Sequence, residues 1–530
     1  MKKAMKKLMA ALLAVAMVCA MAIPAFAAGT GSNTLTINGK TAGHTYEAYQ
    51  VFTGDLKGSV LSNIDWGGGV DGDGILNDAG LPSTLRGLSS VAALAAELAN
   101  LSPSSDEVNT FAEVVSKHLT ANKYTSAESG TTYTITGLPD GYYFIKDATA
   151  TMPEGATYSR YMLNIVTSLT IQAKDTSVTL DKQIKHNETG NWGVVGDNQI
   201  GDTVEFRTIT TVPDTTGYNS YTYEIHDTMS PELTSNVKDA SDITIKVNDS
   251  TVLDSTYYSV TVDPTNSNKF TVSVDIIQAI KDNKLAVDNK LFTYYTGVLN
   301  EKAKIYDEGC QDNEAYLKYS NNPTDGGTGE TPKKKVYDWT FKVDVTKVDG
   351  KDINTKLDGA VFVLSKVSGL DLAPDKDGNP TKNQDSLIKL VNNNNDTYTV
   401  ANTNTTATTT YTMTTPTGGQ ISIKGLDDET KYYLYETKAP GGYNALTAPV
   451  EIKITDNTYD LNGNQIVTQP NVVVNGSNAC SGVGFNVENN AGTTLPGTGG
   501  IGTTIFYVIG GGLMVAAAIL LITKKRMENR

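Results

Sequence analysis

The sequence contains few of the residues that build covalent scaffolds or active sites, with three cysteines and four histidines among 530 residues. Cys19 lies in an N-terminal segment that we expect to be removed, and the sequence leaves open whether Cys310 and Cys480 pair. Two cysteines are too few for a disulfide-rich scaffold. Because the histidines lack metal-ligand spacing and no nucleophile motif is present, we predict no enzyme, no cofactor and no metal site. The histidines are His44, His118, His186 and His226.

Positive charge is also scarce, since 43 lysines and arginines face 58 acidic residues and leave a net charge of −15. An acidic surface repels nucleic acid, so no nucleic-acid partner is expected. Long Leu/Ala helical runs are scarce outside the two ends, whereas Thr, Val, Tyr and Asn are abundant in between. This composition predicts a mainly β chain.

The two ends have the features of export and anchoring segments. Residues 1–27 combine a lysine-rich start, an apolar middle and the small-residue exit of Ala25 and Ala27. This pattern predicts a secretory signal peptide cleaved after Ala27. At the other end, residues 505–522 carry no charge and are followed by basic residues 524–526. Such a segment is long enough to cross a membrane with the basic tail inside.

Between the ends, the sequence divides into three parts of domain size. We place domains at residues 28–176, 177–331 and 332–494, with a terminal signal at 495–530. The polar stretch "TDGGTGETPKKK" at residues 324–335 predicts a linker. A faint repeat, "ITGLPDGYYFIKD" and "IKGLDDETKYYLYET", suggests related β-sandwich modules in series. A minor amphipathic helical patch is expected in the first domain.

The last domain contains a lysine, an acid and an asparagine in strand-like surroundings. Along "VDVTKV", Lys347 shares a strand face with Val343 and Val345, while Glu436 and Asn489 lie in later strands. Burial favours a neutral amine and a neutral carboxylic acid. A neutral amine can attack an asparagine side-chain carbonyl that the acid polarises. Ammonia then leaves and an intramolecular isopeptide bond remains, without an external enzyme.

The segment "ETKAPGGY", which begins at Glu436, resembles the "ExxAPxGY" box of the collagen-adhesin B-type (CnaB-like) modules of Gram-positive pilins. The resemblance implies an Ig-like β-sandwich in which Lys347 bonds to Asn489 beside the catalytic acid Glu436. Asn490 is the rival acceptor.

The middle domain resembles the second, CnaA-like domain of pilin shaft subunits, in which a lysine bonds to an asparagine near an acid on a middle strand. Lys182 lies in "VTLDKQI", and Asn321 lies in the closing segment "YLKYSNNP". The resemblance implies a bond between Lys182 and Asn321 with Asp227 as the acid. Glu224 is the alternative acid and Asn322 the alternative acceptor.

The first domain lacks the same constellation. Its opening "NTLTING" has no lysine at the strand centre, and Lys146 stands where the last domain has Glu436. We therefore predict no isopeptide bond in this domain, which leaves packing to stabilise it.

The motif before the apolar segment consists of Leu495, Pro496, Gly497, Thr498 and Gly499. Followed by an apolar helix and a basic tail, it resembles the cell-wall sorting signal of Gram-positive surface proteins. The resemblance implies that a sortase cuts between Thr498 and Gly499 and passes the threonyl group to an amine. Gly497 stands where the family usually has Glu, Ser or Ala, so the sortase class, pilus-type or housekeeping, stays open.

Lys174 lies at the junction of the first two domains, in "QAKD". In shaft pilins, a "YPKN"-like motif at this position supplies the acceptor lysine, and the resemblance implies that Thr498 of one copy joins Lys174 of the next. Head-to-tail linkage would build an open fibre of identical subunits attached to peptidoglycan and carrying accessory pilins. The alternatives are a monomeric wall-anchored adhesin and an accessory pilin. The sequence names no host or bacterial surface receptor.

Overall fold

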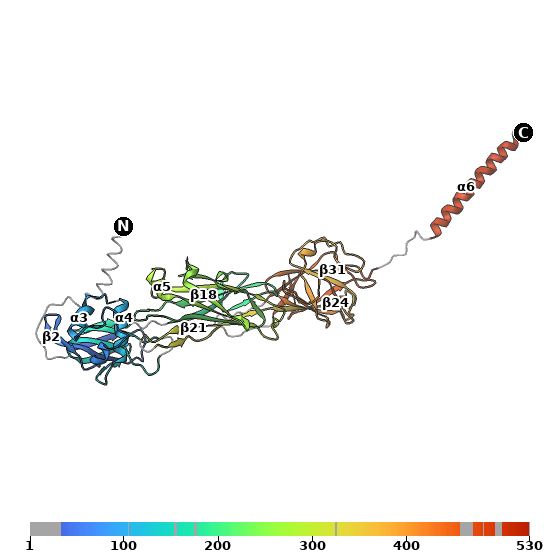
Figure 1. The fold of residues 1–530 in the computed structure, drawn as a ribbon. Helices are drawn as coiled ribbons and strands as arrows, with labels where there is room; N and C mark the ends of the chain where they lie inside the picture. The colour runs from blue at the N-terminus through green and yellow to red at the C-terminus, as the bar shows by residue number, and fades with distance from the viewer. Residues whose placement is uncertain are drawn as a thin grey trace.

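The computed structural model describes residues 33–103, 105–152, 156–173, 178–323, 326–455, 470–480, 482–492 and 501–528. Figure 1 shows three β-rich modules in a row, with a single helix beyond the last of them. Six sheets make up the described modules, two in each. The prediction of a mainly β chain of tandem sandwich-like modules is therefore confirmed.

The first module contains two sheets. One has four strands in the order β5-β6-β1-β9, and the other has five, in the order β3-β2-β7-β8 with β4 paired to β2. Ser90 and Ser105 cap two helices with their side chains, as expected for residues that accept from free helical N–H groups. The helices bury one face against Phe52 and Phe144 of the second sheet. The elements are β1 (Asn33–Asn38), β2 (Tyr46–Lys57), β3 (Val60–Trp66), α2 (Gly72–Leu76), α3 (Val91–Asn100), α4 (Asp106–Lys117), β4 (Tyr124–Thr125), β5 (Ala127–Ser129), β6 (Thr132–Leu138), β7 (Gly141–Asp147), β8 (Arg160–Ile165) and β9 (Leu169–Gln172).

The middle module consists of two seven-stranded sheets, with main orders β11-β10-β13-β20-β16-β17 and β12-β23-β21-β14-β19-β18. Strand β21 alternates buried and half-buried residues along its length, as a strand with one face in a core must. The elements are β10 (Leu180–Lys185), β11 (Trp192–Gly193), β12 (Val195–Asp197), β13 (Thr203–Thr211), β14 (Tyr223–Met229), β15 (Leu233–Ser235), β16 (Thr244–Val247), β17 (Thr251–Val252), β18 (Tyr258–Asp263), β19 (Asn266–Val274), α5 (Ile276–Lys281), β20 (Lys290–Leu299), β21 (Gln311–Ser320), β22 (Thr328–Glu330) and β23 (Lys334–Trp339).

The polar stretch that the sequence predicted to be a linker instead contributes strands to the middle module. Its described part includes β22 and the start of β23, and both strands pair with β21. Polar residues are tolerated there because the strands lie beside β21 with alternate side chains facing solvent. The structure thus places the change of module after Trp339 rather than after residue 331.

The last module is a sandwich of two six-stranded sheets, ordered β28-β26-β27-β30-β24-β35 and β29-β25-β31-β32-β33-β34. Its first and last strands are neighbours and run parallel, with Lys347 opposite Val487 and Asp349 opposite Asn489. The elements are β24 (Phe341–Asp349), β25 (Val361–Ser365), β26 (Leu390–Asn392), β27 (Thr397–Val400), β28 (Thr409–Thr410), β29 (Met413–Thr414), β30 (Gln420–Leu426), β31 (Lys431–Lys438), β32 (Val450–Thr455), β33 (Asn471–Val474), β34 (Ser477–Cys480) and β35 (Gly484–Asn489).

The middle and last modules meet in a packed junction. Their buried apolar residues form one continuous cluster. The backbone N–H of Ile200 donates to the carbonyl of Gly425 at 3.0 Å, and the hydroxyl of Tyr432 donates to the Gln199 side chain at 3.0 Å. The shared apolar cluster and these hydrogen bonds together restrict rotation of one module against the other.

Gly425 is the position at this junction where a side chain cannot be accommodated. Its φ is +84°, and a Cβ would lie 2.5 Å from Cδ1 of Ile200. We expect Gly425→Ala to lower the free energy of unfolding by about 2–4 kcal/mol, measured by thermal unfolding. Gly359, with φ +77° and open space, is the matched control and should cost only about 1 kcal/mol as Gly359→Ala. Equal losses would mean that the contact with Ile200 contributes nothing.

Helix α6 (Ile501–Glu528) stands apart from the three modules in Figure 1. Its segment Val508–Met527 has a mean hydropathy of 1.7 and is long and apolar enough to cross a membrane. The predicted signal peptide, residues 1–27, lies outside the described residues.

Candidate functional site

Lys347, Glu436 and Asn489 lie together in the core of the last module. Lys347 on β24 and Asn489 on β35 come from one sheet, and Glu436 on β31 reaches them from the other. The Nζ atom of Lys347 is 2.5 Å from Oδ1 of Asn489 and 3.4 Å from Oε1 of Glu436. The Asn489 amide nitrogen donates to both carboxylate oxygens of Glu436, at 2.9 and 3.0 Å. All three groups that the predicted chemistry requires are therefore in contact.

Burial sets the electrostatics of this group. The side chains of Lys347 and Glu436 are fully inaccessible to solvent, and Asn489 is 1% exposed. Burial lowers the pKa of Lys347, while the charge of Glu436 acts against that shift. The ring of Phe362 lies 5.9 Å from Nζ and helps to exclude water. A larger fraction of Lys347 is thus a neutral amine than for a lysine in solution.

The "ETKAPGGY" box and the turn that follows it hold Glu436 and the end of β35 in place. The backbone N–H of Leu446 donates to Glu436 at 2.8 Å and orients the carboxylate. The next turn bonds to the chain beyond Asn489, since Asn444 N–H donates to the Asn490 carbonyl at 3.0 Å. Asn490 itself is exposed, and its side chain lies beside Gly350. The geometry therefore favours Asn489 over Asn490 as the acceptor.

Lys182 and Asp227 form the corresponding buried pair in the middle module. Their Nζ and Oδ2 atoms are 2.5 Å apart, and both side chains are fully inaccessible. The hydroxyl of Tyr295 on β20 hydrogen-bonds to both. Glu224 lies on the other face of β14, beside His226, so the structure brings Asp227 rather than Glu224 to the lysine.

Burial shifts the pKa values of this pair in the directions that the chemistry needs. It lowers the pKa of Lys182 and raises the pKa of Asp227, although the attraction between the two charges opposes both shifts. Burial also raises the pKa of Tyr295, which keeps its hydroxyl protonated and available as a donor. Tyr295 was not anticipated from the sequence, where it is one of many strand tyrosines.

The predicted acceptor Asn321 does not reach Lys182. Asp227 lies opposite Ala315 on β21, and at about 3.3 Å per residue Asn321 is about 20 Å further along. It follows the end of the strand, where its side chain lies beside Gly327 and Gly329. Asn322 is one residue further still. The assignment of Asn321 is thus corrected, because the register of β21 carries it past the end of the buried pair.

Asn313 is an asparagine of β21 that lies near Asp227. It is 0% exposed, lies on the inward face of β21, and is only two residues from Ala315. Its side chain is close enough to Asp227 and Tyr295 to lower both pKa values. Within the described part of the chain, neither its amide nitrogen nor its amide oxygen makes a well-aligned hydrogen bond.

In the first module, the described residues include no buried lysine. Lys146 is half-buried on β7, between Glu47 and Arg160 of the neighbouring strands. The buried titratable residues described there include Glu47, Arg160, His44 and Asp147, and the side chains of His44 and Asp147 are 2.6 Å apart. The absence of an isopeptide bond here stays a prediction, and the contact between His44 and Asp147 is a buried polar contact that the sequence did not reveal.

Several predicted residues lie outside the described residues. They are Ala27, the junction lysine Lys174, and the motif residues Leu495, Pro496, Gly497, Thr498 and Gly499.

Two parts of the chain match models of known protein families. Residues 341–465 match the SpaA family model, described as a prealbumin-like fold domain. Residues 487–529 match the LPXTG cell wall anchor motif. No curated protein sequence matches the chain.

Solved structures extend the likeness over most of the chain. The T6 backbone pilin of serotype M6 Streptococcus pyogenes is 18% identical, with a TM-score of 0.50 over 88% of this chain and 100% of that one. The chain is a cell-wall-anchored surface protein with the fold of a backbone pilin. The major pilin SpaD of Corynebacterium diphtheriae is 17% identical, with a TM-score of 0.47 over 87% of this chain and 98% of that one.

Proposed function

We propose that this chain is the shaft subunit of a covalently polymerised pilus on a Gram-positive cell wall. A sortase cleaves between Thr498 and Gly499 and links Thr498 to Lys174 of the next copy, and the finished fibre is attached to peptidoglycan. The observation that carries the proposal is the pair of buried lysine–acid–asparagine groups in a wall-anchored chain of serial modules. Accessory pilins and a surface receptor are further expected partners.

In the last module, the neutral Nζ of Lys347 attacks Cγ of Asn489, and a C–N bond forms. Glu436 accepts hydrogen bonds from the Asn489 amide nitrogen, so it is placed to carry a proton from the attacking amine to that nitrogen. The bond between Cγ and Nδ2 then breaks and ammonia leaves. The buried surroundings strengthen these interactions and exclude the water that would compete.

In the middle module we assign the bond to Lys182 and Asn313, with Asp227 as the proton carrier. The Tyr295 hydroxyl hydrogen-bonds to the Lys182 amine and to the Asp227 carboxylate, and so fixes the two groups relative to each other. The buried amide of Asn313 makes no well-aligned hydrogen bond among the described residues, and this supports the assignment, because such a group is costly unless it has another use.

The two isopeptide bonds would transmit a pulling force from strand to strand without breaking the hydrogen bonds of the sheets. Lys347 and Asn489 lie on the first and last strands of their module, and Lys182 and Asn313 lie on β10 and β21. Tension applied between Lys174 and Thr498 would pass through these crosslinks rather than through hydrogen bonds. A covalent link limits extension in a way that packing cannot.

The polymer can be tested in the native host by probing wall extracts on a denaturing gel. We expect a detergent-resistant ladder from the natural protein and monomers alone from Lys174→Ala. Lys117→Ala, which removes an exposed lysine of the same module, is the control and should keep the ladder. A ladder that survives Lys174→Ala would assign the acceptor to another lysine. Absence of a ladder from the natural protein would favour a monomeric wall-anchored adhesin.

A further inference from the structure

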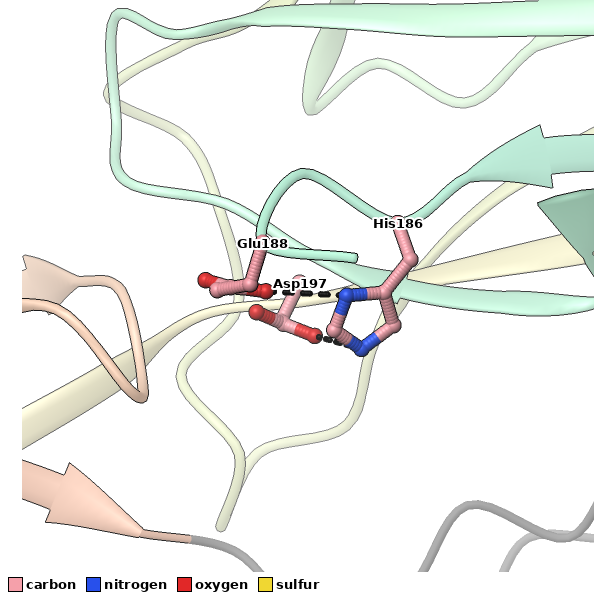
Figure 2. A group of neighbouring side chains, drawn as sticks. All are labelled: His186, Glu188 and Asp197. Atoms are coloured by element: carbon pink, nitrogen blue, oxygen red, sulfur yellow. Dashed lines mark ion pairs between the residues drawn. The ribbon is translucent and has the colours of Figure 1, made fainter. Parts of the chain in front are cut away.

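Acidic side chains gather around His186 at the junction between the middle and last modules. Figure 2 shows His186 with two of them, Glu188 and Asp197, whose carboxylates face the imidazole ring. The imidazole nitrogens lie 2.9 Å from Glu188 Oε2 and 3.4 Å from Asp197 Oδ2. His186 and Glu188 follow β10, and Asp197 ends β12, so all three belong to the middle module.

The last module adds two carboxylates to the same place. Asp427 and Asp428 follow β30 directly. One carboxylate oxygen from each of Glu188, Asp197, Asp427 and Asp428 lies within 4.8 Å of the others. A hydrogen bond of 2.9 Å from the Asn187 amide to Asp427 Oδ2 also crosses the junction here. The four acids therefore form a set with oxygen atoms at the spacing of ligands around a single ion.

Two of these acids place a carboxylate oxygen in the protein interior. Asp427 and Asp428 are 3% and 1% exposed, and the Oδ1 atom of each is buried without a hydrogen-bond partner among the described residues. The other oxygen of Asp427 accepts from Asn187 and from Thr430, at 2.9 and 3.1 Å. A buried carboxylate oxygen that lacks a donor is expensive unless a cation or a proton neutralises it.

The crowding of these carboxylates is itself costly. Asp197, Asp427 and Asp428 are 0%, 3% and 1% exposed, and their carboxylate oxygens lie within 4.8 Å of one another and of Glu188. Ionised carboxylates this close repel one another, and a divalent cation would remove the repulsion.

We propose that Glu188, Asp197, Asp427 and Asp428 bind one calcium ion that ties the middle module to the last. The donor set consists of oxygen atoms, which hard cations prefer. Calcium accepts several carboxylates in flexible geometry, whereas magnesium keeps most of its water and demands a near-ideal octahedron. His186 stands beside two of the proposed ligands, with its ring nitrogens 2.9 Å from Glu188 and 3.4 Å from Asp197.

The sequence shows no sign of this site because its halves are far apart in the chain. The hydrogen bond between Asn187 and Asp427 spans 240 residues. Neither "HNE" nor "LDDE" has the spacing of a calcium loop. The prediction that no metal site is present rested on local spacing alone.

The test uses the full chain in mild detergent, stripped with EDTA and then titrated with CaCl2. We expect a single calcium to bind and the melting temperature to rise by about 5–10 °C at saturation. Terbium, a luminescent substitute for calcium, reports the location: excitation of Tyr432, whose hydroxyl oxygen accepts from the Asp427 N–H at 2.9 Å, should sensitise its emission.

The variant Asp428→Asn distinguishes a loss of calcium binding from a loss of folding. Without calcium this variant should melt at the same temperature as the natural protein or higher, because one buried negative charge is gone. It should lose the calcium-dependent rise and most of the terbium emission. Asp377→Asn, in an exposed polar turn, is the control and should keep both. Absence of calcium binding to the natural protein, or equal calcium binding by Asp428→Asn, would overturn the proposal. Neither outcome depends on whether the chain polymerises.

Discussion

Replacing Glu436 with glutamine is expected to leave the last module without its Lys347–Asn489 crosslink. Glutamine keeps the shape of the side chain but cannot carry the proton that the leaving amine needs. The intact mass should rise by about that of one ammonia relative to the crosslinked protein. Closing a loop of 142 residues is worth about 5 kcal/mol, so the module should also melt at least about 10 °C lower.

Glu488→Gln is the matched control for this experiment. Glu488 lies beside Asn489 on β35, but it is exposed and faces away from the core. The control should keep the crosslinked mass and its melting temperature. If Glu436→Gln still lost ammonia, Glu436 would not be the proton carrier and the proposed chemistry would be wrong.

Substitution of Asn313 is expected to abolish the crosslink of the middle module, whereas substitution of Asn321 should leave it intact. Asn313→Ala removes the carbonyl that Lys182 would attack, so mass spectrometry should show that the middle-module ammonia loss no longer occurs. A tryptic digest should likewise lack the branched peptide that joins Lys182 to β21. The crosslink closes the loop between Lys182 and Asn313, so its loss should lower the free energy of unfolding by about 5 kcal/mol.

Asn321→Ala controls for the removal of an asparagine near the same strand. Because mass reports the bond directly, a variant that folds poorly can still be distinguished from one that folds without the crosslink. A branched peptide present in Asn313→Ala and absent from Asn321→Ala would restore the original sequence assignment. Asn313 would then be only a buried polar residue.

The two asparagines show where sequence patterns stop being informative. Asn313 and Asn321 are an even number of residues apart, so a strand long enough to hold both would point them to the same face. Only the register of β21 against β14 places Asn313 near Asp227 and shows that the strand ends before Asn321. Register depends on pairing between distant segments, which a single strand does not encode.

The last module was more predictable because its residues carry a local signature. The box that begins at Glu436 marks the acid, and alternation along "VDVTKV" places Lys347 on the buried face. Asn489 closes an alternating strand in the same way. Each of these features is contained in a few consecutive residues, so each was available before any contact was known.

The amino-acid sequence was enough to predict the mainly β class, the order of serial modules, the anchoring segment and the lysines that become buried. Those properties follow from composition and from periodicity over short stretches. Only the tertiary structure reveals the asparagine near Asp227, the hydroxyl of Tyr295 beside Lys182, the inclusion of β23 in the middle module, and the acidic cluster around Asp427. These depend on strand register and on the docking of two modules, because both bring together groups that are remote in the chain.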